Sequence, residues 1–169
     1  MEDIIIQRIV LGLGSNLGDR EANINYAIDL LVDKNILSKI IVSSIFKNPA
    51  LLKENSPKEW NIEFYNVAVI GWTSYSPTKL LKKIKEVEIL VGRKKREIWA
   101  PREIDIDILA YGNKVFQNDE LVIPHKDLLN RDFALLPLSE VWPEWKFPVK
   151  GKYYNISVNE LTKIFLNNK

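Results

Sequence analysis

The sequence predicts an α+β fold of the ferredoxin-like type, with elements in the order βαββαβ, an antiparallel sheet, helices packed on one face, and a C-terminal extension. Two observations predict it. Short apolar runs rich in β-branched residues alternate with two segments whose apolar residues recur at helical spacing. The length of 169 residues also suits one domain, so we expect residues 1–169 to form a single domain.

The first half of the chain reads as strand, helix, strand, strand. Residues 8–14 (RIVLGLG) predict a buried strand that runs into a glycine-containing loop. Asp19 is a suitable cap for a helix whose apolar face holds Ile24, Ala27, Ile28 and Leu31. Residues 40–46 and 64–72 are rich in β-branched and aromatic side chains and predict two strands. The loop between them, residues 47–61, is long enough to suggest a functional role.

The second half begins with a helix and ends with another. Ser76 followed by Pro77 predicts a capped helix start, and Gly92 ends a helix with apolar residues Leu80, Leu81, Ile84, Val87 and Val91. Gly112 and Asn113 predict a hairpin turn into residues 115–116. Beyond it we expect an irregular extension, closed by a helix that opens on a capping box of Ser157 and Glu160.

The strand around residue 106 carries the strongest chemical signal. Ile104, Ile106 and Ile108 alternate with Glu103, Asp105 and Asp107, so both aspartates project from one face. Magnesium usually takes one or two carboxylates together with nucleotide phosphates, which such a pair could provide. The alternative is a solvated acidic strand face. Aspartate is a poor strand former, however, so its placement in an isoleucine-rich strand favours a ligand role.

The basic residues near the acid pair suggest a ligand that carries phosphate, and the aromatic residues suggest a second ligand with a flat ring. The basic loop 93–96 and Arg102 would balance the charge of a Mg-nucleotide, although such a loop is also typical of an exposed, soluble surface. His125 is the only histidine, and a lone histidine is more often structural. Phe64 and Asn66 share a strand face that could hold a heterocycle; the alternative is a core phenylalanine and a strand-end amide.

Composition excludes several other classes of site. The absence of cysteine removes disulfides, thiolate zinc sites and cysteine nucleophiles, and suits a reducing compartment. The net charge of +2 is too small for broad attraction to nucleic acid or membrane. There is neither a secretion signal nor an apolar run of about 18 residues. We therefore expect a cytoplasmic protein that binds neither nucleic acid nor membrane.

Together these residues resemble a known family. The run 99–109 (WAPREIDIDIL) resembles the signature of the 6-hydroxymethyl-7,8-dihydropterin pyrophosphokinase family of folate biosynthesis. Residues 14–18 (GSNLG), residues 64–66 (FYN) and the segment 124–138 agree in order and spacing, so the resemblance covers about residues 8–148. It implies a ferredoxin-like fold and transfer of pyrophosphate from ATP to the hydroxymethyl group of the dihydropterin, with release of AMP.

The resemblance also implies roles for single residues. Asp105 and Asp107 would hold two Mg²⁺ ions and, with Arg93 and Arg102, form the catalytic set. Besides Arg93 and Arg102, ATP would be bound by Ile108, His125, Lys126 and Arg131. Phe64 and Phe133 would sandwich the pterin ring, within a pocket completed by Asn48, Pro49, Leu51, Asn66 and Trp99. Trp99 lies on a loop that would close over the substrates.

The sequence departs from the family pattern at three positions. Asn48 stands where Thr is frequent, Lys126 where Tyr or Pro is common, and Glu120 where some members have Arg. Two rival functions are an RNA-binding module and another Mg-dependent enzyme, such as a nucleotide-using transferase or a nuclease. Two aspartates on an RNA-facing strand would repel phosphate, which disfavours the first rival. We expect a monomer whose partners are ATP and the pterin.

Overall fold

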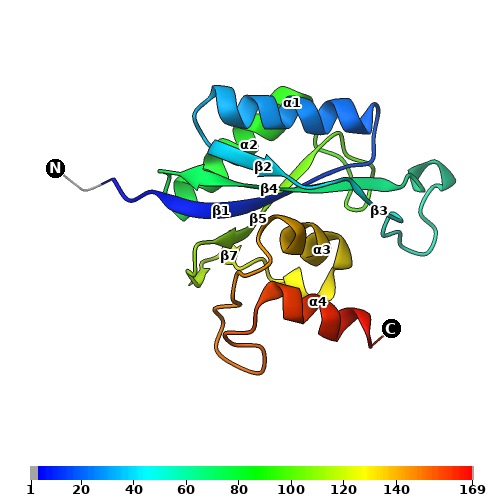
Figure 1. The fold of residues 1–169 in the computed structure, drawn as a ribbon. Coiled ribbons are helices and arrows are strands. Elements are labelled where there is room, and N and C mark those ends of the chain that lie inside the picture. The colour runs from blue at the N-terminus through cyan, green and yellow to red at the C-terminus, as the bar shows by residue number, and fades with distance from the viewer. Residues whose placement is uncertain (1–3, 169) are drawn as a thin grey trace.

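A five-stranded antiparallel sheet forms the middle layer of the computed structural model, which describes residues 4–168 (Figure 1). Its main path runs β2-β4-β1-β5, and β3 also pairs with β4. The strands of this sheet are β1 (Gln7–Ser15), β2 (Ser38–Val42), β3 (Phe46–Asn48), β4 (Phe64–Thr73) and β5 (Asp105–Tyr111). This strand order, with the first and third long strands adjacent in the centre, confirms the ferredoxin-like α+β fold.

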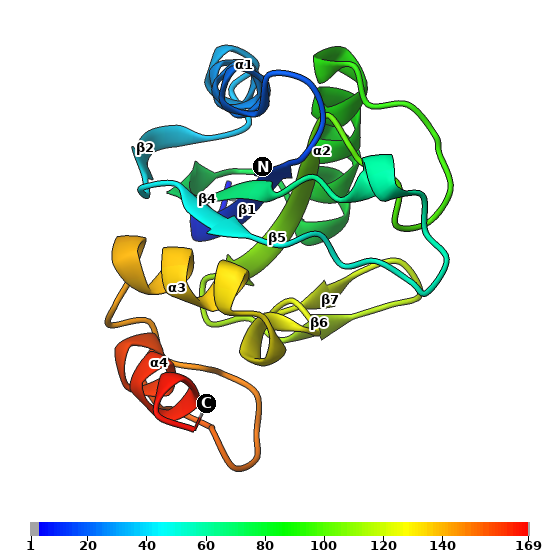
Figure 2. The ribbon, with the colours of Figure 1, turned by 90° about the vertical axis from the view of Figure 1, so that its right-hand side faces the viewer.

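Helices lie on both sides of the sheet. α1 (Arg20–Asp33) and α2 (Pro77–Val91) cover one face, as predicted (Figure 2). α3 (Asp132–Val141) packs on the other face, and α4 (Val158–Leu166) packs against α3 on the side away from the sheet. The C-terminal extension therefore covers part of the face that the βαββαβ unit leaves open.

The alternation of side chains along the strands divides the interior into two cores. Ile9, Leu11 and Leu13 of β1 point toward α1 and α2, where they join the three isoleucines of residues 104–108. Val10 points the opposite way and packs with residues of α3 and α4. A two-residue period thus gives one strand two buried faces.

Several helix boundaries follow from the local sequence. The Asp19 carboxylate accepts a hydrogen bond of 3.0 Å from the Ala22 amide, and the Ser157 hydroxyl accepts one of 3.2 Å from the Glu160 amide. Gly92 ends α2 with a φ of 115°, a conformation that glycine adopts without strain. The capping role predicted for the Ser76 side chain is wrong: α2 begins there, but the hydroxyl makes no capping hydrogen bond.

Three elements differ from the sequence prediction. The predicted strand 40–46 is two strands, β2 and β3, separated by residues 43–45. The Gly112 turn exists, but β6 (Phe116–Gln117) after it pairs with β7 (Val122–Ile123) and not with β5. The segment expected to be irregular contains α3. Short 3₁₀ turns at Lys58–Trp60 and Leu128–Asn130 complete the described chain.

None of the helices formed by residues 4–168 combines the length and the apolar character that a membrane crossing requires. The predicted domain range also includes residues 1–3 and 169, which lie outside the described part of the chain.

Candidate active site

Two glycines of β1 leave the sheet surface beside the acid pair without side chains. Asp105 lies opposite Gly14 and Asp107 lies opposite Gly12, and Gly14 in turn lies opposite Asn66 of β4. Directly opposed residues of antiparallel strands share a face, so carboxylates and amide stand on the same side of the sheet with no side chain between them. A Cβ atom on Gly14 would lie 2.9 Å from the Asn66 Oδ1 atom. The hollow above the sheet therefore depends on this glycine.

This hollow collects most of the predicted site residues. It contains about 870 Å³ of empty space, part of it open to solvent. The predicted residues that line it are Asn48, Leu51, Phe64, Asn66, Trp99, Arg102, Asp105, Asp107, His125, Arg131 and Phe133. We call this space the aromatic cavity. Pro49 is exposed and does not line it.

A second hollow lies on the other side of the acid pair, between α2, β5 and residues 118–126. We call it the lysine groove because four lysines line it: Lys79, Lys82, Lys85 and Lys126. Ile108, which was predicted to touch the nucleotide, also lines this groove. Asp107 and His125 line both hollows, so the groove and the cavity meet at these two side chains.

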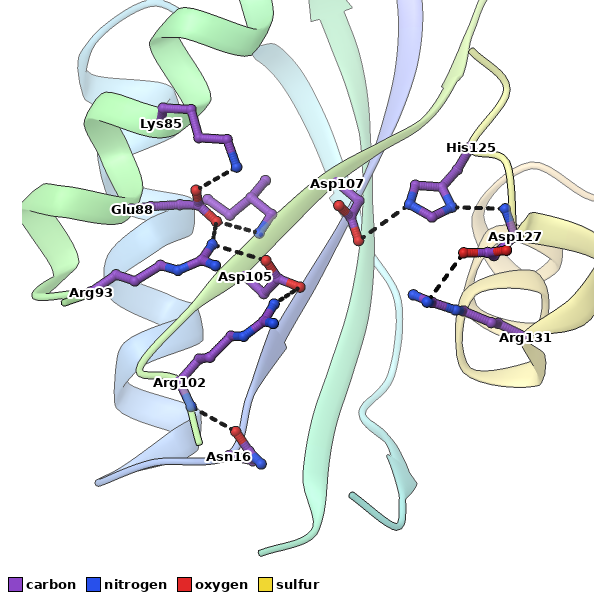
Figure 3. Close-up of polar contacts among 11 residues, drawn as sticks. Asn16, Lys85, Glu88, Arg93, Arg102, Asp105, Asp107, His125, Asp127 and Arg131 are labelled. Atoms are coloured by element: carbon purple, nitrogen blue, oxygen red, sulfur yellow. Dashed lines mark hydrogen bonds and ion pairs between the residues drawn. The ribbon is translucent and has the colours of Figure 1, made fainter. Parts of the chain in front are cut away.

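Asp105 is held between two arginines (Figure 3). The Arg93 Nη1 atom lies 2.9 Å from one carboxylate oxygen, and the Arg102 Nη1 atom lies 3.2 Å from the other. Arg93 also contacts Glu88 of α2 at 2.5 Å. Burial opposes the charge on Arg93, but the carboxylates of Glu88 and Asp105 outweigh it and raise the pKa of Arg93. Arg93 therefore reaches the acid pair through Asp105, although it lines neither hollow.

Asp107 has a different environment. Partial burial, and next the neighbouring Asp105 carboxylate, raise its pKa to about 7. The ring of His125 lies beside it, with the His125 Nε2 atom 3.7 Å from the carboxylate, too far for a direct hydrogen bond. The acid pair thus consists of one carboxylate neutralised by arginines and one that carries little compensating charge.

His125 is held in one tautomer. Its Nδ1 atom accepts a hydrogen bond of 3.2 Å from the Asp127 amide, so the proton of the neutral ring belongs on Nε2, which faces Asp107 (Figure 3). Burial, and then the positive charge of Arg131, lower the pKa of His125 and favour this neutral form. Arg131 is itself paired with the Asp127 carboxylate at 3.2 Å. His125 can therefore donate a hydrogen bond at the junction of the two hollows.

The donor set at the junction fits magnesium. Asp105 and Asp107 offer oxygen atoms from one face of β5, and no group of three or more His, Cys, Asp or Glu side chains suited to a metal occurs within residues 4–168. A zinc centre needs three or four protein ligands, whereas magnesium is commonly held by one or two carboxylates, water and phosphate. The residues present therefore fit a metal that arrives with a nucleotide.

The loop of residues 92–104 contributes Trp99, Ala100 and Arg102 to the lining of the aromatic cavity. Trp99, at its tip, lines the cavity and has a φ of 74°, a left-handed conformation that is strained for a bulky residue. An ion pair between Arg96 and Glu103, with nitrogen and oxygen 2.5 Å apart, joins the two sides of the loop. Trp99 thus lines the cavity from a loop whose two sides are joined by this ion pair.

Asn16 fixes the start of the acid-bearing segment, a role that the sequence did not reveal. The Asn16 Oδ1 atom accepts a hydrogen bond of 2.8 Å from the backbone amide of Arg102. The backbone amide of Asn16 in turn donates to the Arg102 carbonyl at 3.1 Å. Its side-chain nitrogen donates to the Ile62 carbonyl at 3.2 Å. Only its place in the GSNLG motif marked it, because Arg102 is 86 residues away.

Comparison with known proteins identifies similar chains. A family model described as 7,8-dihydro-6-hydroxymethylpterin-pyrophosphokinase (HPPK) matches residues 10–143. A 2-amino-4-hydroxy-6-hydroxymethyldihydropteridine pyrophosphokinase of Aquifex aeolicus is 42% identical over 144 residues, which cover 85% of this chain and 86% of the relative. A relative of that name in Haemophilus influenzae is 31% identical over 94% of this chain and 93% of its own length.

Longer proteins also match. A folate synthesis bifunctional protein of Chlamydia muridarum is 39% identical over 87% of this chain, and the match spans 33% of the relative, so this chain covers about a third of that protein's length. The crystal structure of wild-type Plasmodium falciparum HPPK-DHPS with pteroate superposes with a TM-score of 0.69 at 19% identity, covering 99% of this chain and 44% of that one. The structural match supports the fold.

We predict that Asn16→Ala loosens the segment before the acid pair. The variant leaves the Arg102 amide without its acceptor, so the free energy of unfolding should fall by about 2 kcal/mol. Hydrogen exchange should show faster exchange at the Arg102 amide. Asn23→Ala is the matched control, because it removes one hydrogen bond of 2.8 Å to the Leu17 carbonyl and should leave Arg102 protected. Unchanged protection of Arg102 in Asn16→Ala would contradict this role.

Proposed function

The chain belongs to the 7,8-dihydro-6-hydroxymethylpterin pyrophosphokinase family, and from this premise we propose that it transfers pyrophosphate from ATP to 6-hydroxymethyl-7,8-dihydropterin in folate biosynthesis. The observation that carries the proposal is the meeting of two unlike hollows at Asp107 and His125. One hollow is aromatic and the other is lined by lysines, as a flat heterocycle and a polyphosphate require. Their junction is where a phosphate and a hydroxyl group would meet.

The aromatic cavity would take the pterin. Phe64 and Phe133 supply aromatic faces, as the residue roles of the family suggest. The Asn66 side-chain nitrogen donates to the Asn48 Oδ1 atom, and the Asn48 nitrogen donates to the Pro49 carbonyl at 2.9 Å. These bonds leave the Asn66 Oδ1 atom free above Gly14 to accept a hydrogen bond from the polar edge of the ring. Pro49 and Asn48 would thus act by orienting Asn66.

The lysine groove would take ATP. Its lysines would contact the phosphates, although the carboxylates of Glu86, Asp119 and Glu120 also line the groove, and Ile108 adds an apolar residue to the lining. Lys126 lies within this groove, so the lysine that replaces the more common residue there adds positive charge on the nucleotide side. Glu120 also lines the groove, where an arginine occurs in some relatives of the family.

We assign two Mg²⁺ ions to Asp105 and Asp107. When bound, they supply the positive charge that lets a triphosphate approach two carboxylates and that stabilises the charge-rich transition state. Arg102, whose ion pair with Asp105 at 3.2 Å is partly exposed, would be free to contact the phosphate oxygens if metal took over the neutralisation of that carboxylate. His125 would donate its Nε2 proton in a hydrogen bond to a phosphate, and Arg131 would contact the same group.

The transfer itself needs little from a protein base. The pterin hydroxymethyl oxygen forms a bond to the β phosphorus, the bond from that phosphorus to the α,β-bridging oxygen breaks, and AMP leaves while the hydroxyl proton passes to water. Reactions of this kind depend mainly on in-line positioning and charge stabilisation. Closure of Trp99 over the cavity would exclude bulk water and so limit hydrolysis of ATP. We also propose a monomeric, cytoplasmic enzyme, in keeping with a chain free of cysteine.

The direct test is to incubate the protein with Mg-ATP and 6-hydroxymethyl-7,8-dihydropterin and to identify the nucleotide product. We expect AMP, formed only when the pterin is present. Chromatography with ADP and AMP standards separates the outcomes. ADP as the product, or no turnover by folded protein, would contradict the proposed function.

We predict that Asp105→Asn and Asp107→Asn each lower turnover by at least about a hundredfold, because charge stabilisation of the transition state is lost. Steady-state kinetics at saturating substrates measures the effect, and circular dichroism checks the fold. Asp29→Asn, the same change on the exposed face of α1, is the control and should be fully active. Near-normal activity of both site variants would refute the metal role.

The raised pKa of Asp107 gives a prediction on pH. Its carboxyl group should hold a proton up to about pH 7 in the free protein, so metal binding should strengthen as the pH rises through that value. A carbon NMR titration of labelled aspartate should give a midpoint near 7 that falls when Mg²⁺ is added. Asp105→Asn should also lower the midpoint, since the Asp105 charge helps to raise it. A midpoint near 4 in the wild-type protein would contradict this assignment.

A further inference from the structure

Glu88 is a buried acid on the apolar face of α2. Its side chain is 3% exposed, and it follows Ile84 by one helical repeat, on the stripe that packs against the sheet. A charged group in such a place is costly unless it is paired and hydrogen bonded. A glutamate at this position of the stripe was a signal in the sequence that a specific partner exists.

The partners of Glu88 come from three elements (Figure 3). Its Oε2 atom accepts a hydrogen bond of 2.9 Å from the Ile106 amide of β5 and lies 2.5 Å from the Arg93 Nη1 atom. Its Oε1 atom lies 3.0 Å from the ammonium group of Lys85, one turn earlier on α2. One carboxylate thus connects the helix, the start of the basic loop and the acid-bearing strand.

The bond to Ile106 fixes the acid pair from behind. Ile106 is the residue between Asp105 and Asp107, and β5 is the last strand on its side of the main sheet path. The amide of Ile106 would otherwise be a buried donor without a partner on the α2 side, which is unfavourable. Glu88 therefore holds the backbone from which both aspartates project.

The contact with Arg93 changes what Arg93 can do. The same Nη1 atom of Arg93 donates to Glu88 and, at 2.9 Å, to Asp105. With Asp105 alone as a partner, Arg93 would neutralise a carboxylate that the proposed function needs for a metal. With Glu88 as a second, buried partner, Arg93 keeps a counter-charge when Asp105 turns to another ligand.

We propose that Glu88 is a positioning residue that anchors Arg93 at the acid pair and holds the Asp105–Asp107 backbone, so that Asp105 is free to bind metal while Arg93 keeps its place beside the acid pair. This proposal rests on the proposed function. Glu88 does not line the aromatic cavity, where the pterin is proposed to bind, so it acts on the phosphate side of the site. Its loss should therefore change nucleotide chemistry and leave pterin binding intact.

The test compares Glu88→Gln with the control Glu21→Gln, an identical change on the exposed surface of α1. Glutamine can still accept from the Ile106 amide but cannot anchor a guanidinium by charge. We expect kcat to fall by about tenfold to a hundredfold, as for a misplaced catalytic group, with the KM for pterin unchanged. Should Glu88→Gln fail to fold, Glu88→Asp keeps the charge, shortens its reach, and should show the same loss.

A double-mutant cycle separates positioning from plain structural support. If Glu88 acts through Arg93, adding Glu88→Gln to Arg93→Ala should change kcat within about threefold, whereas independent structural damage would multiply the two losses. Multiplying losses, or normal kinetics of Glu88→Gln, would overturn the proposal while leaving the proposed function in place.

A binding measurement distinguishes the two levels of failure. Calorimetry with Mg²⁺ and a non-hydrolysable α,β-methylene analogue of ATP reports on the nucleotide site without turnover. Weaker binding of the analogue by Glu88→Gln than by wild type supports the proposal even if the wild-type protein turns over no pterin. If the wild-type protein neither binds the analogue nor makes AMP, the proposed function and the role of Glu88 both fail.

Discussion

The two-residue period of β5 is the constraint on which the site depends. Ile104 and Ile106 are buried in the core against α1 and α2, which forces Asp105 and Asp107 onto the opposite face. Turning either carboxylate away would bring an isoleucine out of that core, at a cost of about 2 kcal/mol or more for each side chain exposed. Burial of these isoleucines therefore offsets the repulsion between the two neighbouring carboxylates.

The neighbouring strand completes the geometry by providing space. Gly12 and Gly14 stand opposite the acids, and any larger residue at Gly14 would collide with Asn66. The same face of the sheet is covered by α3 farther along, so the cavity is the part of that face that the C-terminal extension leaves open. One part of this sheet face therefore packs against α3, and another part lines the aromatic cavity.

Charge is distributed unequally across the junction of the two hollows. Asp105 is paired with Arg93 and Arg102, whereas Asp107 has the largely neutral His125 beside it at 3.7 Å and feels Arg131 and Lys85 only from farther away. Burial, and then the charge of the neighbouring Asp105, raise the pKa of Asp107, and the proposed metal would supply the positive charge that this carboxylate lacks. Glu88 and Asn16 line neither hollow, but their hydrogen bonds to the Ile106 and Arg102 amides hold the segment that carries the acid pair in place.

The sequence by itself determined the α+β class, the order of the main strands and helices, and the acid pair on one face, because periodicity and capping act between residues a few positions apart. It also marked most of the cavity lining through the resemblance of short motifs. Only the tertiary structure decided the pairing of Asn16 with Arg102, the division of residues 40–46 into two strands, the helix after Arg131, and the partners of Glu88. These features depend on contacts between segments far apart in the chain, whose energies no local pattern contains.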